Sequence, residues 1–280
     1  MTPIHDQSYR RYVGVRQAPG SAWLTIATTG IRTVLGKKLF LLVLLAAWGQ
    51  FFVRAVTFYL SANFPELEIL APSVETFRQF FEIQEIFVLF VTVYVGSGLV
   101  ANDRRSNAIQ IYLSKPLSRV EYVVGKLGTL VFFLLLVTLA PALALLFLEI
   151  MFSASVAFVG ANLFLIPAIT LYALVEVLLS AFTMLALSSL TTSARYTAML
   201  YAGVVLFTAA LFSILFGITN SSALAWLSFR ANLEQIGDVI FRLPPRYDSS
   251  WLLSAVVVAL LVGLSVFVLE RRVRGVEVVT

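Results

Sequence analysis

The chain has 280 residues, of which 60% are hydrophobic and 12% are charged, and its mean hydropathy is +0.92. Soluble domains carry roughly 25% charged residues, and a soluble fold of this size could not bury so much apolar surface. The composition therefore predicts an integral membrane protein, in which the net charge of +5 reflects Lys and Arg beside the membrane rather than nucleic-acid binding. The absence of cysteine excludes disulfides and thiolate metal sites, and the one histidine, His5, argues against a histidine-based site.

Residues 1–38 are expected to form a cytoplasmic tail followed by an amphipathic helix. No early apolar run typical of a signal peptide precedes Lys38. Ser21 is a candidate N-cap, and beyond it apolar side chains share one helical face while threonines and Arg32 share the other. We expect this helix at the inner membrane interface, with Trp23 as an anchor; a surface anchor without a further role is an equal alternative. The apolar face comprises Trp23, Ile26, Ala27, Ile31, Val34 and Leu35.

Six apolar stretches are long enough to cross a membrane, which takes about 20 residues of helix. Pro141 and Pro167 fall in the third and fourth stretches, so we expect a bend near each. The predicted spans are Leu39–Leu60, Ile83–Ala101, Tyr122–Leu148, Leu163–Leu190, Tyr196–Ile218 and Trp251–Leu269.

The distribution of Lys and Arg predicts the orientation of these spans. With the N-terminus inside, nearly all Lys and Arg residues lie in the inner segments, and the outer segments hold only Arg78, Arg230, Arg242 and Arg246. This bias follows the positive-inside rule. Because the number of spans is even, both termini are expected in the cytoplasm.

The first internal loop, residues 102–121, is the most charged internal segment. Asn102 or Asp103 is expected to cap a short helix that continues through Leu113, and Pro116 should break it. Ser118 and Glu121 have the spacing of a capping box, which begins a new helix. That helix would extend to Leu148, on the order of 45 Å at about 1.5 Å per residue, and would exceed the roughly 30 Å hydrocarbon core.

Apolar side chains within this loop distinguish it from an ordinary basic inner loop. Such groups in a cytoplasmic segment need a protein or lipid surface to cover them. We therefore expect a docking surface joined at Pro116 to the third span, which would tilt when the surface is pushed. The apolar groups are Ile109, Ile111, Tyr112, Leu113 and Leu117.

The long outer loop, residues 219–250, contains a further amphipathic helix pattern. Trp226, Phe229, Leu233, Ile236 and Ile240 recur at steps of three and four residues, and Pro244–Pro245 should end the helix. We expect it to lie on, or dip into, the outer face of the membrane.

Three charged residues lie within predicted spans, where ionisable groups are costly and often functional. Arg54 and Glu85 have similar depths near the outer side, so a structural Arg54–Glu85 ion pair is expected, with snorkelling of either group as part of the same structural reading. Glu176 lies near the middle of the fourth span. It is expected either to line a substrate path or to accept a hydrogen bond from a serine or threonine of a neighbouring helix.

Several segments of the sequence resemble a known family. Gly98-Leu99-Val100-Ala101 through Arg105, Tyr112 through Arg119, and Tyr122 with Gly125-Lys126 look like the signature loop of type-2 ABC exporter permeases. Leu187–Leu190 and the tail from Glu270 to Glu277 are also similar to the family. The N-terminal amphipathic segment departs from it by carrying less charge.

The resemblance implies an all-α polytopic membrane protein: one permease domain over residues 1–280 with six transmembrane helices, an N-terminal elbow helix, a cytoplasmic coupling helix and outer-face helices before the last span. It implies two cytoplasmic ABC ATPase subunits and a second permease chain, identical or not, in a prokaryotic plasma (inner) membrane, with membrane lipids around them and no nucleic acid. No phosphate-binding loop is present, so ATP and Mg²⁺ would bind the partner ATPase and this chain would hold no cofactor. The implied ATPase-coupling residues are Asp103, Arg104, Ile109, Tyr112, Leu113, Lys115, Pro116, Leu117 and Arg119.

Four functions are to be compared with these features of the sequence, and the first two fit them best. The first is a permease that exports an unknown substrate with energy from a separate ATPase. The second is an ABC-type subunit that transmits force to an outer-face accessory protein without moving a substrate. A secondary transporter or channel acting alone is disfavoured by the absence of a repeat with broken helices, and a membrane-embedded enzyme lacks a cluster of catalytic side chains.

Overall fold

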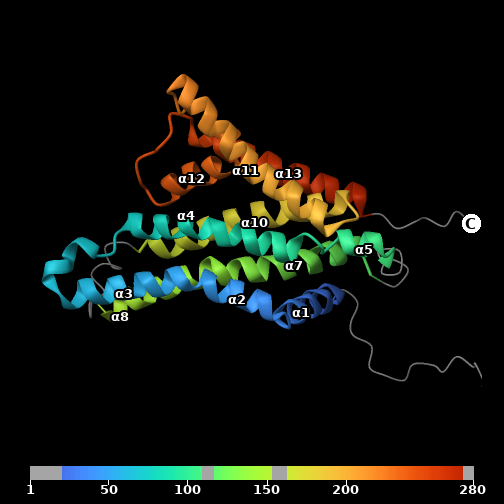
Figure 1. Ribbon diagram of the computed structural model, residues 1–280, viewed down its shortest axis with the longest axis horizontal. Coiled ribbons are helices and arrows are strands. Elements are labelled where there is room, and N and C mark those ends of the chain that lie inside the picture. Colours follow the sequence, from blue (N-terminus) through green and yellow to red (C-terminus); the bar gives the residue numbers. More distant parts are fainter. Residues whose placement is uncertain (1–20, 109–116, 153–162, 274–280) are drawn as a thin grey trace, which may run out of the picture.

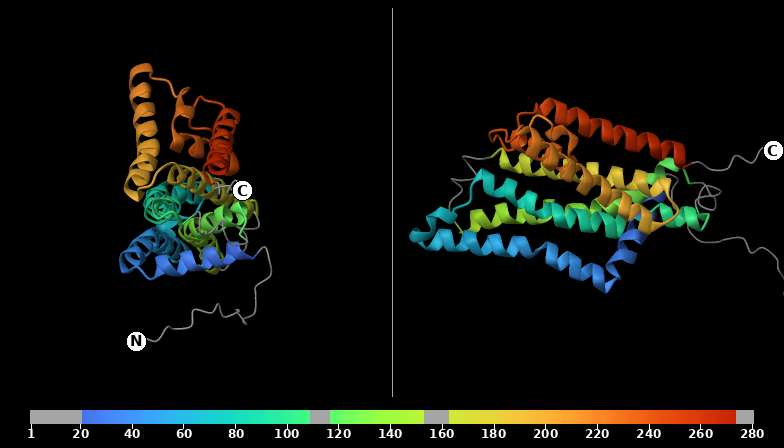
Figure 2. Two further views of the ribbon diagram at one scale, coloured as in Figure 1. Left: turned by 90° about the vertical axis from the view of Figure 1, so that its right-hand side faces the viewer. Right: turned by 45° about the horizontal axis from the view of Figure 1, so that its top comes forward.

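The computed structural model describes residues 21–108, 117–152 and 163–273. Over these ranges the chain is all-α, and most helices follow one long axis (Figure 1). Helix α1 (Ala22–Leu35) instead crosses the end of the bundle at a steep angle (Figure 2). We refer to the two ends of the bundle as the α5 end and the α12 end, after helices α5 (Ala101–Arg105) and α12 (Phe229–Ile240).

The described residues contain six helical segments that are long and apolar enough to span a membrane, which confirms the six predicted spans. Most extend beyond the predicted bounds, because polar caps such as Ser73 and Ser118 begin helices before the apolar stretch. The six segments are Lys38–Asn63, Val74–Arg105, Arg119–Phe152, Leu165–Leu190, Ala194–Thr219 and Trp251–Arg272.

The first three spans are each divided into shorter helices, whereas α10 (Leu165–Leu190), α11 (Ala194–Thr219) and α13 (Trp251–Arg272) are continuous. The divided spans are α2 (Lys38–Ala47) with α3 (Gly49–Asn63); α4 (Val74–Val91) with the π-helix η2 (Thr92–Gly96) and α5; and α7 (Arg119–Val137) with α8 (Leu139–Phe152). Two 3₁₀ segments, η1 (Pro65–Leu70) and η3 (Ala225–Leu227), complete the described elements.

The break in the third span has the expected cause. Pro141 has no N–H to donate to the carbonyl of Val137, and the helix is interrupted between them at Thr138. The buried side chain of Gln84 donates instead to Val137 O at 2.6 Å and also to Ala47 O at 3.0 Å, where α2 ends. Pro167, by contrast, lies in the first turn of α10, where no intrahelical N–H bond is lost, so the bend expected there is wrong.

Helix α1 packs directly against α7 through glycine. A Cβ added to Gly125 of α7 would lie 2.7 Å from the Cβ of Ile26 and 2.8 Å from the carbonyl oxygen of Trp23. One added to Gly30 of α1 would lie 2.5 Å from the hydroxyl of Thr129. Small residues let two helix backbones approach closely in a membrane protein. The amphipathic helix is therefore held by protein contacts, and its buried residues are Ala27 and Val34.

Helices α11, α12 and α13 lie together on one side of α10 and α4 (Figures 1 and 2). Helix α12 is capped at its start by Ser228, whose hydroxyl accepts from the N–H of Ala231 at 3.2 Å. It ends at Ile240, with Arg242 in the left-handed region (φ 57°). It thus ends before Pro244. Most of α12 is buried among its neighbours rather than lying on a surface. Helix α11 buries only Thr197 and Tyr201 and leaves large apolar side chains exposed along its length.

Candidate functional site

At the α5 end, the helix of the second span is interrupted, and a side chain of the fourth span forms hydrogen bonds with the backbone there. After η2 the backbone turns through Ser97, and α5 begins at Ala101. The hydroxyl of Ser188 on α10 accepts from the N–H groups of Val100 and Ala101 at 3.1 and 3.0 Å, and donates to the carbonyl of Ser97 at 2.9 Å. Ser188 is fully buried. One hydroxyl thereby satisfies three backbone groups that the interrupted helix leaves without intrahelical partners.

Asp103 of α5 joins this segment to the third span. Its Oδ2 accepts from the hydroxyl of Tyr122 at 2.8 Å and lies 2.7 Å from the ammonium of Lys126. Tyr122 and Lys126 are four residues apart on α7, so both lie on the face that meets α5. The Lys126 ammonium also lies 5.5 Å from the centre of the Tyr122 ring. Charge-assisted bonds of this kind are stronger than neutral ones.

Arg104 of α5 joins the same segment to the fourth span by donating to the carbonyl of Ser189, close to the end of α10. A cation at a helix C-terminus satisfies an orphan carbonyl and complements the helix dipole. The second, third and fourth spans therefore meet at one polar contact. We call it the α5 junction, comprising Ser97, Asp103, Arg104, Tyr122, Lys126 and Ser188.

The start of α7, next to the α5 junction, has the expected capping box. The hydroxyl of Ser118 accepts from the N–H of Glu121 at 3.1 Å, and the Glu121 carboxylate accepts from the N–H of Ser118 at 2.9 Å. Leu117 is half-buried against the core, while Arg119 and Val120 are exposed. The helix start is thus well defined and presents a small surface beyond the bundle.

The expected short helix beginning at Asn102 or Asp103 is wrong in its start. Both residues lie inside α5, which continues the second span, and the backbone turns after Arg105 with Asn107 in the left-handed region (φ 54°). Asparagine tolerates this conformation better than most residues. Asn102 and Asp103 have the side chains of helix caps, but the second span continues through them as α5, so they do not begin a new helix. Five of the expected coupling residues lie outside the described residues: Ile109, Tyr112, Leu113, Lys115 and Pro116.

At the α12 end, an ion-pair cluster joins α4 to the segment around α12. Asp238 of α12, fully buried, accepts from Arg78 of α4 at 2.7 Å and from Arg246 at 2.8 Å. Arg246 also pairs with Glu82 of α4 at 2.6 Å. We call these four residues the α12 cluster.

Arg246 lies outside the spans and remains charged in this cluster. Burial opposes its charge, but hydrogen bonds to Asp238 and Glu82 outweigh burial and raise the pKa of Arg246 above its usual value. This site was not expected from the sequence. Its local signal in the sequence was the four-residue spacing of Arg78 with Glu82, which suits an ion pair on one helix.

The expected Arg54–Glu85 pair is wrong, because Glu85 pairs with Arg230 of α12 at 2.8 Å. Gln84 already faces α2 and α7, and successive helical residues point about 100° apart, so Glu85 faces another direction. The buried Nε of Arg54 on α3 has no hydrogen-bond partner in the described part of the chain. Arg54 and Glu85 therefore have similar depths in the membrane, but their side chains point in different directions.

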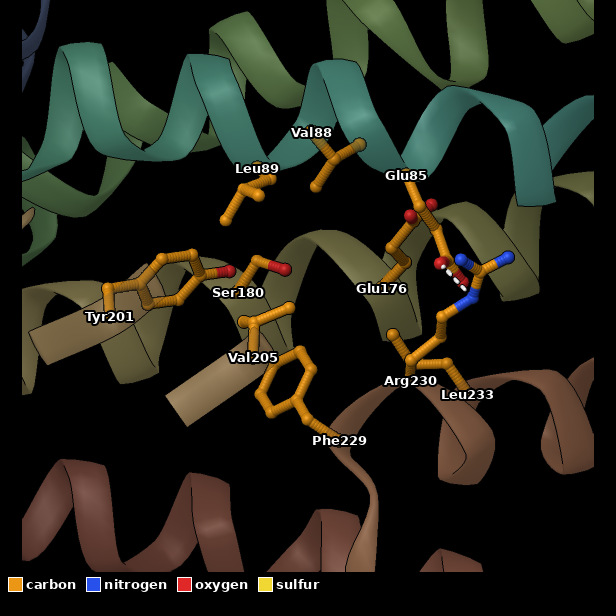
Figure 3. Close-up of a pocket in the computed structure, with 10 residues that line it drawn as sticks. All are labelled: Glu85, Val88, Leu89, Glu176, Ser180, Tyr201, Val205, Phe229, Arg230 and Leu233. Carbon is orange, nitrogen blue, oxygen red and sulfur yellow. Dashed lines mark ion pairs between the residues drawn. The ribbon is translucent and has the colours of Figure 1, made fainter. Parts of the chain in front are cut away.

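Glu176 is buried within α10, at 1% exposure, and lines a small cavity (Figure 3). Neither of its oxygens has a hydrogen-bond partner among the described residues, so the alternative of a bond from serine or threonine is not observed. Glu85, Ser180, Tyr201 and Arg230 line the same cavity, together with apolar side chains from α4, α11 and α12. Over the described ranges, no group of three or more His, Asp or Glu is placed to hold a metal ion.

Comparison with known proteins identifies the family. No curated protein matches the chain. The family model described as ABC-2 family transporter protein matches residues 25–258, a range that includes every described residue of the α5 junction and the α12 cluster. This match agrees with the six spans and with the resemblance seen in the first internal loop. The chain therefore belongs to the ABC-2 transporter family and is a multi-pass membrane permease subunit of an ABC transporter.

Proposed function

We propose that this permease exports a substrate when a separate ATPase moves the α5 junction. The observation that carries the proposal is that α5 is bonded to both α7 and α10, so a displacement of α5 must move three spans together. Two cytoplasmic ABC ATPase subunits would bind ATP and Mg²⁺, and this chain would hold no cofactor. The chain contains no phosphate-binding loop of its own, which supports the assignment of ATP binding to separate subunits.

The second span provides a path for the movement. Its helical segment extends from Val74 to Arg105, with the α12 cluster near one end and the α5 junction at the other. The π-helix η2 lies between them, and π-helical turns often mark functional positions in helices. Gly96 of η2 packs tightly on Met184 of α10, since an added Cβ would lie 2.4 Å from its side chain. A tilt of α5 would therefore be transmitted along α4 and would strain the α12 cluster.

The charges at the two ends support an orientation with the α5 end inside. That end carries many cationic side chains, whereas the α12 end carries fewer and pairs several of them with carboxylates. Both termini would then be cytoplasmic, in a prokaryotic plasma membrane. The exposed apolar side of α11 supports contacts with lipid or with a second permease chain, identical or related. The cationic residues at the α5 end include Lys37, Arg105, Arg119, Arg195, Arg271 and Arg272.

Purification and reconstitution test this proposal. Affinity purification of the full chain from its native membrane should recover an ABC ATPase, and the complex in sealed vesicles should move a substrate with ATP but not with a non-hydrolysable analogue. Recovery without any ATPase would contradict the proposal.

Force transmission to an outer-face protein is the competing outcome of the same experiment. It would appear as ATP hydrolysis that releases or remodels an accessory protein while no substrate crosses the membrane. The burial of α12 among the spans favours export, because a buried helix can regulate a path between spans more readily than it can bind an external protein.

A further inference from the structure

The cavity beside Glu176 contains acceptor atoms that its own donors do not satisfy. Both carboxylate oxygens of Glu176 and the Oε1 of Glu85 are buried and have no hydrogen-bond partner among the described residues. Figure 3 shows the two glutamate side chains next to one another, with the carboxylate of Glu85 directed toward Arg230. The remaining oxygen of Glu85, Oε2, is the one that pairs with Arg230 at 2.8 Å.

The formal charges around this cavity do not balance. Arg230 offsets Glu85 and also bonds to Glu234 at 2.8 Å, and no cation among the described residues pairs with Glu176. An unpaired carboxylate is strongly disfavoured in an apolar environment. One further positive charge would complete the site.

The geometry and chemistry of the lining indicate which cation fits. The cavity measures about 30 Å³, which exceeds what one water molecule requires. An ammonium group has three N–H donors, the same number as the unfilled acceptors. Calcium and magnesium instead require six or more oxygen ligands, and no third carboxylate or histidine joins the pair in the part of the chain described.

The cavity of about 30 Å³ has room for the ammonium group of an amine, and apolar side chains adjoin it. Val88, Leu89, Val205, Phe229 and Leu233 provide apolar surface beside the two carboxylates. The ring of Tyr201 adds an aromatic wall. Apolar walls with a few convergent polar groups are typical of small-molecule sites.

We propose that Glu176 and Glu85 form a binding site for the ammonium group of a primary amine, supplied by a free alkylamine or by an aminophospholipid headgroup. The amine nitrogen would donate to both oxygens of Glu176 and to Oε1 of Glu85, while Arg230 holds the other oxygen of Glu85 in place. The role of this amine as cargo rests on the proposed function. Binding itself does not, because it is measured without ATPase or ATP.

Equilibrium dialysis with radiolabelled propylamine tests the site on the full chain in nanodiscs made of phosphatidylcholine and phosphatidylglycerol. We expect saturable binding that 1-propanol does not displace. Trimethylpropylammonium, which keeps the charge but has no N–H donors, should compete at least about tenfold more weakly, because charge-assisted hydrogen bonds are lost. Absence of saturable binding would mean that Glu176 holds only a proton and would overturn the proposal, as would equal competition by trimethylpropylammonium.

Variants of the same chain locate the binding. Glu176→Gln should weaken propylamine binding at least about tenfold, whereas Glu149→Gln, a change at a buried carboxyl group outside the cavity, should leave it unchanged. If Glu176→Gln fails to fold, Ser180→Thr serves instead, because its added methyl group takes up space in the cavity and both carboxylates are kept. Unchanged binding in the folded variant would overturn the proposal.

The source of the amine is distinguished by the lipid. Replacement of phosphatidylcholine by phosphatidylethanolamine should reduce propylamine binding if the headgroup reaches the cavity, and this result assigns the site to a lipid amine. Unchanged propylamine binding assigns it to a free amine. Either result supports an ammonium site.

Discussion

At the scale of single residues, polar side chains in the spans form hydrogen bonds with backbone groups that lack intrahelical partners where a helix is interrupted. Gln84 donates to two carbonyls at breaks in the first and third spans, and Ser188 bonds three backbone groups where the second span turns. The sequence drew attention to the charged residues Arg54, Glu85 and Glu176 instead. Burial of Glu176 could be expected from its position alone, and Ser188 lies in the segment Leu187–Leu190 that resembles the family. The bonding partners of Gln84 and Ser188 could not be predicted, because these partners are backbone groups at helix breaks that become visible only in the fold.

Replacement of Ser188 tests this role. Ser188→Ala should leave the N–H groups of Val100 and Ala101 without acceptors and lower the free energy of unfolding by about 1–3 kcal/mol. Ser189→Ala is a matched control, since that equally buried hydroxyl bonds, among the described residues, to the carbonyl of Ala186 within its own helix. Thermal unfolding of both variants in nanodiscs measures the difference. Equal stability of the two variants would show that the cap at α5 contributes nothing.

At the scale of elements, helix starts and breaks that depend on a few adjacent residues could be predicted from the sequence. The capping box at Ser118 and Glu121 and the helix break before Pro141 follow from a few adjacent residues, and both are present. The start of α5 and the partner of Glu85 depend on how whole helices continue and face one another, and both expectations failed. The packing of α1 on α7 likewise could not be predicted from the sequence, because the close contacts at Gly30 and Gly125 depend on where the two helices cross.

The crossing of α1 and α7 yields a second prediction. Gly125→Ala should lower the melting temperature and detach α1, because the new methyl group would meet both backbone and side-chain atoms of α1 within 3 Å. Gly263→Ala on α13 is the control: no atom lies within 4 Å of its added Cβ, and alanine favours a helix by up to about 1 kcal/mol over glycine. Limited proteolysis at residues 21–38 reports detachment. Greater protection in Gly125→Ala than in the unmodified chain would contradict the packing described.

At the scale of the whole molecule, the second span connects two polar sites at opposite ends of the bundle. The α12 cluster holds α4 to α12, and the α5 junction holds α5 to α7 and α10. The number of spans could be predicted from hydropathy and the family from motif, whereas the coupling role of the first internal loop stays a prediction. The α12 cluster could not, because residues 78 and 238 are far apart in sequence and meet only after the spans pack.

Restraint of the α12 cluster should block transport without preventing ATPase binding. The chain has no native cysteine, so Arg78→Cys with Asp238→Cys can be bridged selectively by a short bifunctional methanethiosulfonate. We expect the bridged complex to lose ATP-driven transport and to regain it on reduction, because the helices can then separate. The single-cysteine variants control for loss of the ion pair. Full transport by the bridged complex would exclude opening between α4 and α12.

The most direct test of coupling is the ATPase rate of the reconstituted complex carrying Asp103→Asn. This change removes the ion pair with Lys126, whereas Asp248→Asn makes the same chemical change at the far end, where the carboxylate bonds to Ser222. We expect Asp103→Asn to assemble with the ATPase while its hydrolysis rate falls to that of the ATPase alone, and Asp248→Asn to retain the rate of the unmodified complex. An unchanged rate in Asp103→Asn would contradict coupling through the α5 junction.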